Sequence, residues 1–288
     1  MTLNIESPLV STGWLQDNLD NPRLRILDCS MVMQPNDDGT FGFVPATSVF
    51  EEGHIPNSIY VNLDELSDQE HELNLMMPAP EVLAENMRKN GIGDDTAVVC
   101  YDRSNHAWAS RVWWMLKSCG FDNAAVLDGG YKKWLNDNNP VSTESTTYPE
   151  ADTFSVHHRP AQMVNKERVI DALENQDAQL LHSLPLPMFT GEVNAYGRPG
   201  RIPGSKHMYC ENLINPENNT FIGLQEIQAK YNEAGVSNEQ PVIAYCGGGI
   251  AASANALALT LAGHKDIAVY DGSLSEWCAD PDLPLETD

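Results

Sequence analysis

The sequence lacks closely spaced pairs of cysteines and is poor in basic residues. Its six cysteines are dispersed and form no Cys-x-x-Cys pair, which argues against a zinc site and against a disulfide framework. Only 17 Lys and Arg stand against 41 Asp and Glu, so the net charge is -24. Because binding to a phosphate backbone requires basic patches, we expect no nucleic-acid partner.

Long apolar segments are also missing. No run of about 18 apolar residues occurs that could cross a membrane, and residues 1–15 lack the basic start and apolar stretch of a secretory leader. Residues of hydrophobic type make up 42% of the chain, which is enough for a full core. We therefore expect a soluble cytoplasmic protein with reduced thiols and no membrane partner.

One cysteine stands in a distinctive setting. Cys246 follows the apolar run Val242–Tyr245 and precedes Gly247, Gly248 and Gly249, after which a helical pattern begins at Ile250. Backbone amides of a glycine-rich loop and the positive end of a helix dipole favour an anion at this point, so a thiolate or persulfide would be stabilised there. The alternative is an inert buried cysteine beside a tight turn. Three successive glycines favour the reactive cysteine, since a turn alone rarely requires so much bare backbone.

The chain repeats itself with a period of about 145 residues. The segment 90–102, which ends Ala-Val-Val-Cys-Tyr-Asp, is echoed by 234–246, which ends Pro-Val-Ile-Ala-Tyr-Cys, so Asp102 takes the place of Cys246. The motifs at 124–134, 53–58 and 25–28 recur in the same order at 267–277, 200–205 and 179–182. Four ordered matches indicate a duplication.

Short apolar runs alternate with helical patterns in each half, which is typical of a mainly parallel sheet flanked by helices. In the first half we expect strands at 25–29, 58–62, 97–101 and 124–127, and helices at 11–19, 80–89 and 107–118. We expect an α/β fold with domains at 1–140 and 161–288, joined by a linker at 141–160 that ends with a β-like segment at 153–156. Ligands of such sheets collect beyond the carboxyl ends of the strands, where Cys246 lies.

These residues resemble the two-domain rhodanese-type sulfurtransferases, the thiosulfate and 3-mercaptopyruvate sulfurtransferase group, over nearly the whole chain. The carrying motifs are Gly-His-Ile-Pro at 53–56, Val-Val-Cys-Tyr-Asp at 98–102, Leu-Asp-Gly-Gly-Tyr at 127–131, Arg-Ile-Pro-Gly-Ser at 201–205, Tyr-Cys-Gly-Gly-Gly-Ile-Ala-Ala at 245–252 and Tyr-Asp-Gly-Ser at 270–273. The resemblance implies a tandem of rhodanese-like domains in which only the second is catalytic.

The resemblance also implies a reaction. Cys246 attacks the outer sulfur of a small anionic donor, thiosulfate or 3-mercaptopyruvate, becomes a persulfide and passes the sulfur to cyanide or a thiol. The implied reaction requires no metal and no cofactor. The residues expected to hold the persulfide through their amides are Gly247, Gly248, Gly249, Ile250, Ala251 and Ala252. The basic groups expected to bind the donor are Arg198 and Arg201, with a surface or structural role as the alternative for Arg201.

The sequence departs from the family pattern in the second domain. The family has Asp-x-Arg after the first strand, where this chain has His182-Ser-Leu184, and the loop after Cys246 has neither the Arg or Lys of the thiosulfate type nor the serine of the mercaptopyruvate type. His182 is either a titrating group or the polar end of a strand, and Asp271 either forms a turn or orients the loop. The alternative function is a non-enzymatic persulfide carrier or sulfur-relay protein; a phosphatase is disfavoured because its loop requires an arginine near Ala251–Ser253.

Overall fold

The protein is described from a computed structural model that covers residues 3–35 and 41–288. The chain forms two compact units. Unit 1 comprises Met1–Glu70, Met77–His158 and Pro216–Thr220, and unit 2 comprises His71–Met76, Arg159–Asn215 and Phe221–Asp288. Residues 1–2 and 36–40 of the predicted first domain lie outside the described residues.

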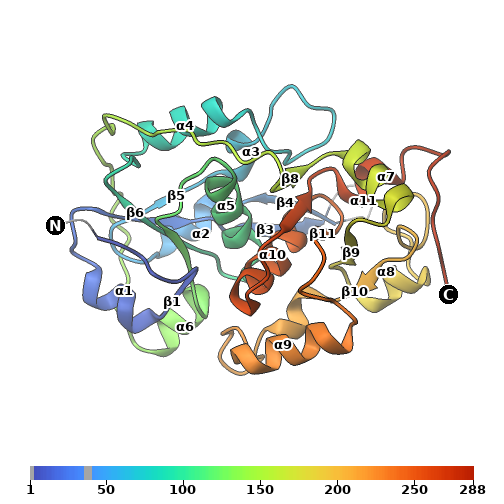
Figure 1. Ribbon diagram of the computed structural model, residues 1–288. Coiled ribbons are helices and arrows are strands. Elements are labelled where there is room, and N and C mark those ends of the chain that lie inside the picture. Colours follow the sequence, from blue (N-terminus) through green and yellow to red (C-terminus); the bar gives the residue numbers. More distant parts are fainter. Residues whose placement is uncertain (1–2, 36–40) are drawn as a thin grey trace. The chain divides into compact units, whose positions relative to one another are not determined.

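Unit 1 is built on a parallel five-stranded sheet with the strand order β1-β7-β6-β2-β5 (Figure 1). The strands of this sheet are β1 Leu9–Val10, β2 Leu24–Asp28, β5 Ser58–Tyr60, β6 Ala97–Tyr101 and β7 Ala124–Leu127. Two further strands, β3 Met31–Pro35 and β4 Phe41–Pro45, pair with each other. Its helices are α1 Thr12–Asn18, α2 Thr47–Glu52, α3 Leu63–Leu66, α4 Pro80–Lys89, α5 Ala107–Ser118 and α6 Gly130–Asn136.

Unit 2 repeats this topology. Its sheet has the order β10-β9-β11-β12-β8, which read backwards matches unit 1 strand for strand. The strands are β8 Met163–Val164, β9 Gln179–His182, β10 Lys206–His207, β11 Val242–Tyr245 and β12 Ile267–Tyr270. The helices are α7 Lys166–Asn175, α8 Leu186–Thr190, α9 Leu224–Glu233, α10 Ile250–Ala262 and α11 Ser273–Trp277, with a 3-10 turn at Cys210–Leu213. The predicted duplication and the predicted α/β class are confirmed.

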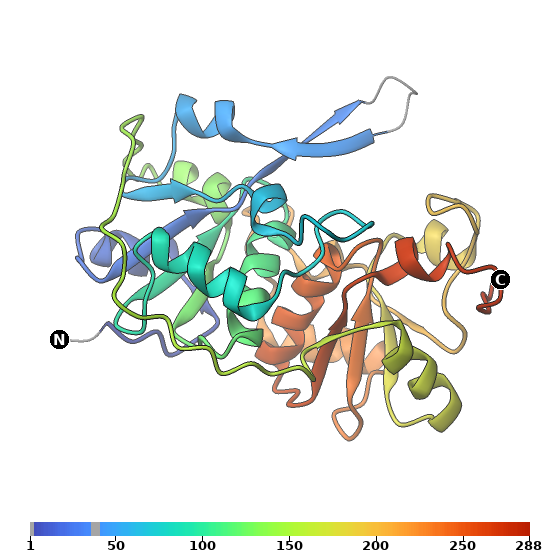
Figure 2. The same cartoon turned by 90° about the horizontal axis from the view of Figure 1, so that it is seen from above.

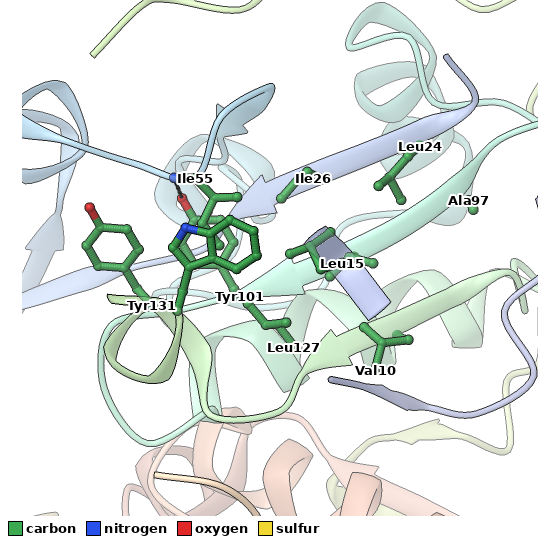
Figure 3. Packing of buried hydrophobic residues seen from close by; sticks show 12 residues of the cluster. Val10, Leu15, Leu24, Ile26, Ile55, Ala97, Tyr101, Leu127 and Tyr131 are labelled. Carbon is green, nitrogen blue, oxygen red and sulfur yellow. Dashed lines mark hydrogen bonds between the residues drawn. The ribbon is translucent and has the colours of Figure 1, made fainter. Parts of the chain in front are cut away.

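Local sequence explains where these elements begin and how they are buried. The Ser11 hydroxyl accepts a hydrogen bond from the amide of Trp14 at 3.1 Å and caps α1. Pro80 opens α4, where its missing N–H is not needed. Every residue of β6 is buried, because the strand lies between β2 and β7 and helices such as α5 pack on the face of the sheet. Figure 3 shows part of the core of unit 1, a cluster that includes Leu15 of α1, Ile26 of β2 and Tyr101 of β6.

Two segments of unit 1 differ from expectation. The predicted strand at 153–156 is wrong, because Thr153 and Ser155 hydrogen-bond to Asp94, in the turn before β6, and not to a strand. The antiparallel hairpin β3–β4 was not predicted. It is an excursion after β2 that extends away from the sheet (Figure 2), so the alternation of parallel strands and helices gives no signal for it.

Candidate functional site

Cys246 lies where the sequence predicts, between the carboxyl end of β11 and the start of α10. Its side chain is almost completely buried, with 2% of the residue exposed. The backbone around it is anchored by the following turn: the amide of Leu274 donates to the carbonyl of Cys246 at 3.0 Å, and the amide of Ser275 donates to the carbonyl of Gly247 at 2.9 Å. The loop is therefore fixed to the segment that follows β12.

Ser273 is the side chain that shapes the loop. Its hydroxyl oxygen accepts hydrogen bonds from the amides of Cys246 at 3.0 Å and Gly249 at 3.2 Å, and it donates to the carbonyl of Tyr270 at 2.7 Å. Ser273 is completely buried. One hydroxyl thus joins both ends of the three-residue turn that follows the cysteine, which sequence reasoning did not predict.

The backbone of Ser273 is left-handed, with φ of +48°. The equivalent residue of unit 1 is Gly130, with φ of +54°, and in each unit the next residue donates its amide to the carbonyl at the loop position, Asp102 or Cys246, at 3.0 Å. A residue with a Cβ is strained in this region by about 1 kcal/mol or more. Serine at position 273 therefore strains the backbone where glycine would not. We attribute its presence to the hydroxyl, which binds the amides of Cys246 and Gly249.

Five amides of the loop are left without an acceptor. Those of Gly247, Gly248, Ile250, Ala251 and Ala252 make no hydrogen bond to any described residue, as expected for the first turn of a helix. The Cys246 sulfur also makes no hydrogen bond within the described chain. These amides are consequently available to an anion that is bound to the cysteine, whereas the amides of Cys246 and Gly249 are occupied by Ser273.

The equivalent loop of unit 1 binds a carboxylate through its backbone amides. The buried Asp102 carboxylate accepts hydrogen bonds from the amides of Ser104 at 2.9 Å, His106 at 3.2 Å and Ala109 at 3.0 Å. Ala109 is the third residue of α5, as Ala252 is the third residue of α10. The first half therefore satisfies its loop with a carboxylate of its own, and the second half replaces that carboxylate with a thiol.

The three glycines have different reasons to be present. Gly249 has φ of +76°, which favours glycine. A Cβ on Gly247 would collide with the Tyr196 hydroxyl at 1.9 Å, whereas a Cβ on Gly248 would meet nothing within 4 Å. Gly248 is the position at which a side chain can be added without a clash.

Raised pKa values disfavour a nucleophilic role for four of the other cysteines. All six cysteines are buried and none is in a disulfide. Burial raises the pKa of the Cys119 thiol to about 11, and burial raises the pKa of the Cys29, Cys210 and Cys278 thiols as well, with the charge of Cys246 adding to the shift at Cys210. These four thiols stay protonated at neutral pH and are poor nucleophiles.

The two candidate arginines are bound to the C-terminal segment of unit 2. Arg198 donates to the carbonyls of Asp280 at 2.7 Å and Leu283 at 2.9 Å. Arg201, 7% exposed, pairs with Glu286 at 2.6 Å and Asp288 at 2.8 Å. Both guanidinium groups thus have protein partners, and donor binding by them stays a prediction.

His182 ends β9 and is completely buried. Burial lowers its pKa to about 3, and the charges of His207 and Arg201 contribute in the same direction. The imidazole is therefore neutral at physiological pH, and the interpretation as the polar end of a strand fits its surroundings better than a titrating group. Asp271 is buried in the turn after β12, but the loop contacts come from Ser273, two residues later.

Neither a metal site nor a membrane span is apparent within the described ranges. No three His, Cys, Asp or Glu side chains among residues 3–35 and 41–288 are grouped so that they could hold a metal ion. In the same ranges no helix is both long enough and apolar enough to cross a bilayer.

Comparison with known proteins agrees with the repeated fold. The model of the rhodanese-like domain matches residues 11–137 and 161–280. Over 96% of the chain and 97% of the relative, the sequence is 30% identical to the 3-mercaptopyruvate sulfurtransferase of Escherichia coli K12. Thiosulfate sulfurtransferase of Cricetulus griseus is 33% identical, with 93% of this chain and 91% of the relative covered.

Solved structures give the same picture. The crystal structure of SseA from Escherichia coli, described as a 3-mercaptopyruvate sulfotransferase, superimposes with a TM-score of 0.81 at 29% identity, covering 93% of this chain and 98% of that one. A variant of EanB, in complex with ergothioneine covalently linked with a persulfide cysteine, gives a TM-score of 0.82 at 25% identity, covering 97% and 70%. With one matched domain in each unit, this chain belongs to the rhodanese-like domain family.

Proposed function

We propose that this protein is a sulfurtransferase that carries sulfur as a persulfide on Cys246. The proposal rests on the contrast between the two loops. The Asp102 carboxylate accepts hydrogen bonds from three amides of its own loop, whereas five amides of the loop after Cys246 have no acceptor among the described residues. Such amides stabilise an anionic sulfur at a helix N-terminus. The names of the relatives support the same activity.

The reaction proceeds in two displacements. The Cys246 thiolate attacks the outer sulfur of thiosulfate, the S–S bond of the donor breaks, and sulfite leaves with the bonding electrons. With 3-mercaptopyruvate the C–S bond breaks instead, and pyruvate leaves after protonation of the carbon. Cyanide or a thiolate then attacks the outer sulfur of the persulfide, which forms thiocyanate or a new persulfide and restores the Cys246 thiolate.

Donor selection follows from what surrounds this loop. Residues 247–252 carry no charge, so binding of either anion relies on amides, on the helix dipole and on more distant basic groups. Arg198 and Arg201 remain our candidates for those groups, and both would have to bind the donor while keeping or exchanging their present partners. The proposal therefore includes both donors.

The acidic charge and the reduced cysteines support two further parts of the proposal. A net charge of -24 disfavours nucleic acid as a partner. Six buried cysteines without a disulfide are typical of a reducing compartment, which supports a cytoplasmic location.

The deciding experiment is a steady-state assay of both donors with cyanide as acceptor. We expect thiocyanate from thiosulfate, pyruvate from 3-mercaptopyruvate, and neither product with Cys246→Ser. Cys210→Ser is the matched control, because Cys210 is equally buried in the same unit and should be dispensable for turnover. A protein that accumulates a persulfide but turns over neither donor would be a sulfur carrier and not an enzyme.

A further inference from the structure

The tip of Tyr196 lies against the loop that follows Cys246. A Cβ built on Gly247 would be 1.9 Å from the Tyr196 hydroxyl oxygen, 2.4 Å from Cζ and 2.8 Å from Cε1. The hydroxyl is therefore the part of the ring nearest to the loop. The glycine that follows the cysteine is required here because a phenol occupies the space that a side chain would fill.

The position of Tyr196 is fixed by the core of unit 2. Its ring is half-buried and packs against the cluster that contains Tyr245 and Trp277. Two residues further on, Arg198 ties the same segment to the carbonyls of Asp280 and Leu283. The phenol is thus held over the loop from both the sheet and the C-terminal segment.

The hydroxyl of Tyr196 has no acceptor in the described part of the chain. Burial, followed by the charge of the Cys246 thiolate, raises the pKa of Tyr196 far above its usual range. The group therefore remains a neutral O–H at neutral pH and can act as a donor toward a nearby anion. An anion bound at the loop after Cys246 would supply the acceptor that this hydroxyl lacks among the described residues.

We propose that the Tyr196 hydroxyl donates a hydrogen bond to the sulfur carried by Cys246 and so acts as a catalytic residue beside the loop amides. The inference rests on the proposed sulfur transfer and adds a side-chain group to it. A neutral donor suits this loop, which has no cation of its own. In the ground state the phenol faces the thiolate, and after attack on the donor it faces the persulfide anion, so it lowers the energy of both negatively charged sulfur species.

The test is Tyr196→Phe, which keeps the ring and its packing and removes only the hydroxyl. We expect kcat/KM to fall about 10- to 100-fold for both donors, as for loss of one hydrogen bond to a charged group. We also expect the midpoint of the iodoacetamide alkylation rate of Cys246 against pH to move upward. The control is Tyr231→Phe, a buried phenol of the same unit that donates to Asn255 at 2.7 Å and should leave both readouts unchanged.

The two readouts keep this inference separate from the proposed function. If the wild-type protein turns over neither donor, the proposed function fails, and the alkylation midpoint still reports whether Tyr196 stabilises the thiolate. If Tyr196→Phe has the melting temperature, the kinetics and the alkylation midpoint of the wild type, the inference is overturned. A folded Tyr196→Phe protein with slower turnover and a raised midpoint would support it, because simple loss of packing would move neither quantity.

Discussion

Ser273 gives the sharpest test of how the loop after Cys246 is held. Among the described residues, its hydroxyl is the sole acceptor for the amides of Cys246 and Gly249, at 3.0 and 3.2 Å, and all three residues are buried. Ser273→Ala leaves both amides unsatisfied. At about 1 to 2 kcal/mol for each buried amide, the free energy of unfolding should fall by about 2 to 4 kcal/mol.

Ser273→Gly separates the hydroxyl from the backbone strain. Glycine loses the same two hydrogen bonds, but it adopts φ of +48° without strain. The glycine variant should therefore be about 1 kcal/mol more stable than the alanine variant. Both variants should alkylate Cys246 more slowly and lose about tenfold in kcat/KM, since the loop amides are no longer held in place.

Urea unfolding followed by tryptophan fluorescence, together with iodoacetamide alkylation, measures both effects. Ser253→Ala is the matched control: Ser253 donates to the carbonyl of Gly249 at 2.8 Å from within α10, and its loss should cost about 1 kcal/mol without freeing either amide. The reasoning is refuted if Ser273→Ala is as stable and as reactive as the wild type, or if the glycine variant is the less stable of the two.

Three other changes test the surroundings of the loop. Gly248→Lys adds a cation at a position without a clash and should lower the KM for thiosulfate by about tenfold, and an unchanged KM would contradict this view of the loop. His182 has a pKa of about 3 against 6.5 in the unfolded chain; its contribution to stability is therefore complete above pH 6.5 and is lost as the pH falls. By pH 5 the wild type should have lost about 2 kcal/mol more than His182→Phe in urea unfolding, and equal losses would exclude this account. If Arg198 and Arg201 bind the donor, each change to Gln should raise the KM for thiosulfate by about tenfold, whereas a lower melting temperature with an unchanged KM would assign them to the C-terminal segment alone.

The sequence predicts the parts of this protein that depend on local pattern. The run Val242–Tyr245, the glycines and the helix from Ile250 lie as expected, because a buried strand, a bare turn and an apolar helix each have a short-range signal. The equal strand order of the two units follows from a duplication that was visible as repeated motifs. Local pattern thus sufficed for the fold and for the position of Cys246 between a strand and a helix.

Local sequence patterns do not predict contacts between residues that are distant in the chain. Ser273 bonds to an amide 27 positions earlier, and Arg201 pairs with a carboxylate 85 positions later. The available signal for Ser273 was its place in the repeat, where the first half has Gly130. Tyr196 had no signal in the sequence, because only the folded chain brings its hydroxyl against Gly247.

The Asp102 loop explains why the duplicated scaffold serves two purposes. In unit 1 a carboxylate closes the amide site permanently, which stabilises the loop and leaves nothing to react. In unit 2 the smaller thiol leaves the amides open, and Ser273 supplies part of the stabilisation that the carboxylate provides in unit 1. The two loops thus satisfy their amides differently, through a carboxylate at position 102 in unit 1 and through the hydroxyl of Ser273, where unit 1 has Gly130, in unit 2.

The central claim is that sulfur resides on Cys246 and moves on from it. The most direct measurement is mass spectrometry of the intact protein and of its peptides after treatment with thiosulfate or 3-mercaptopyruvate, and again after addition of cyanide. We predict the gain of one sulfur atom on the peptide that contains Cys246 and its loss when thiocyanate forms. No added sulfur with either donor, or sulfur on Cys210 or Cys278 in place of Cys246, would contradict the account.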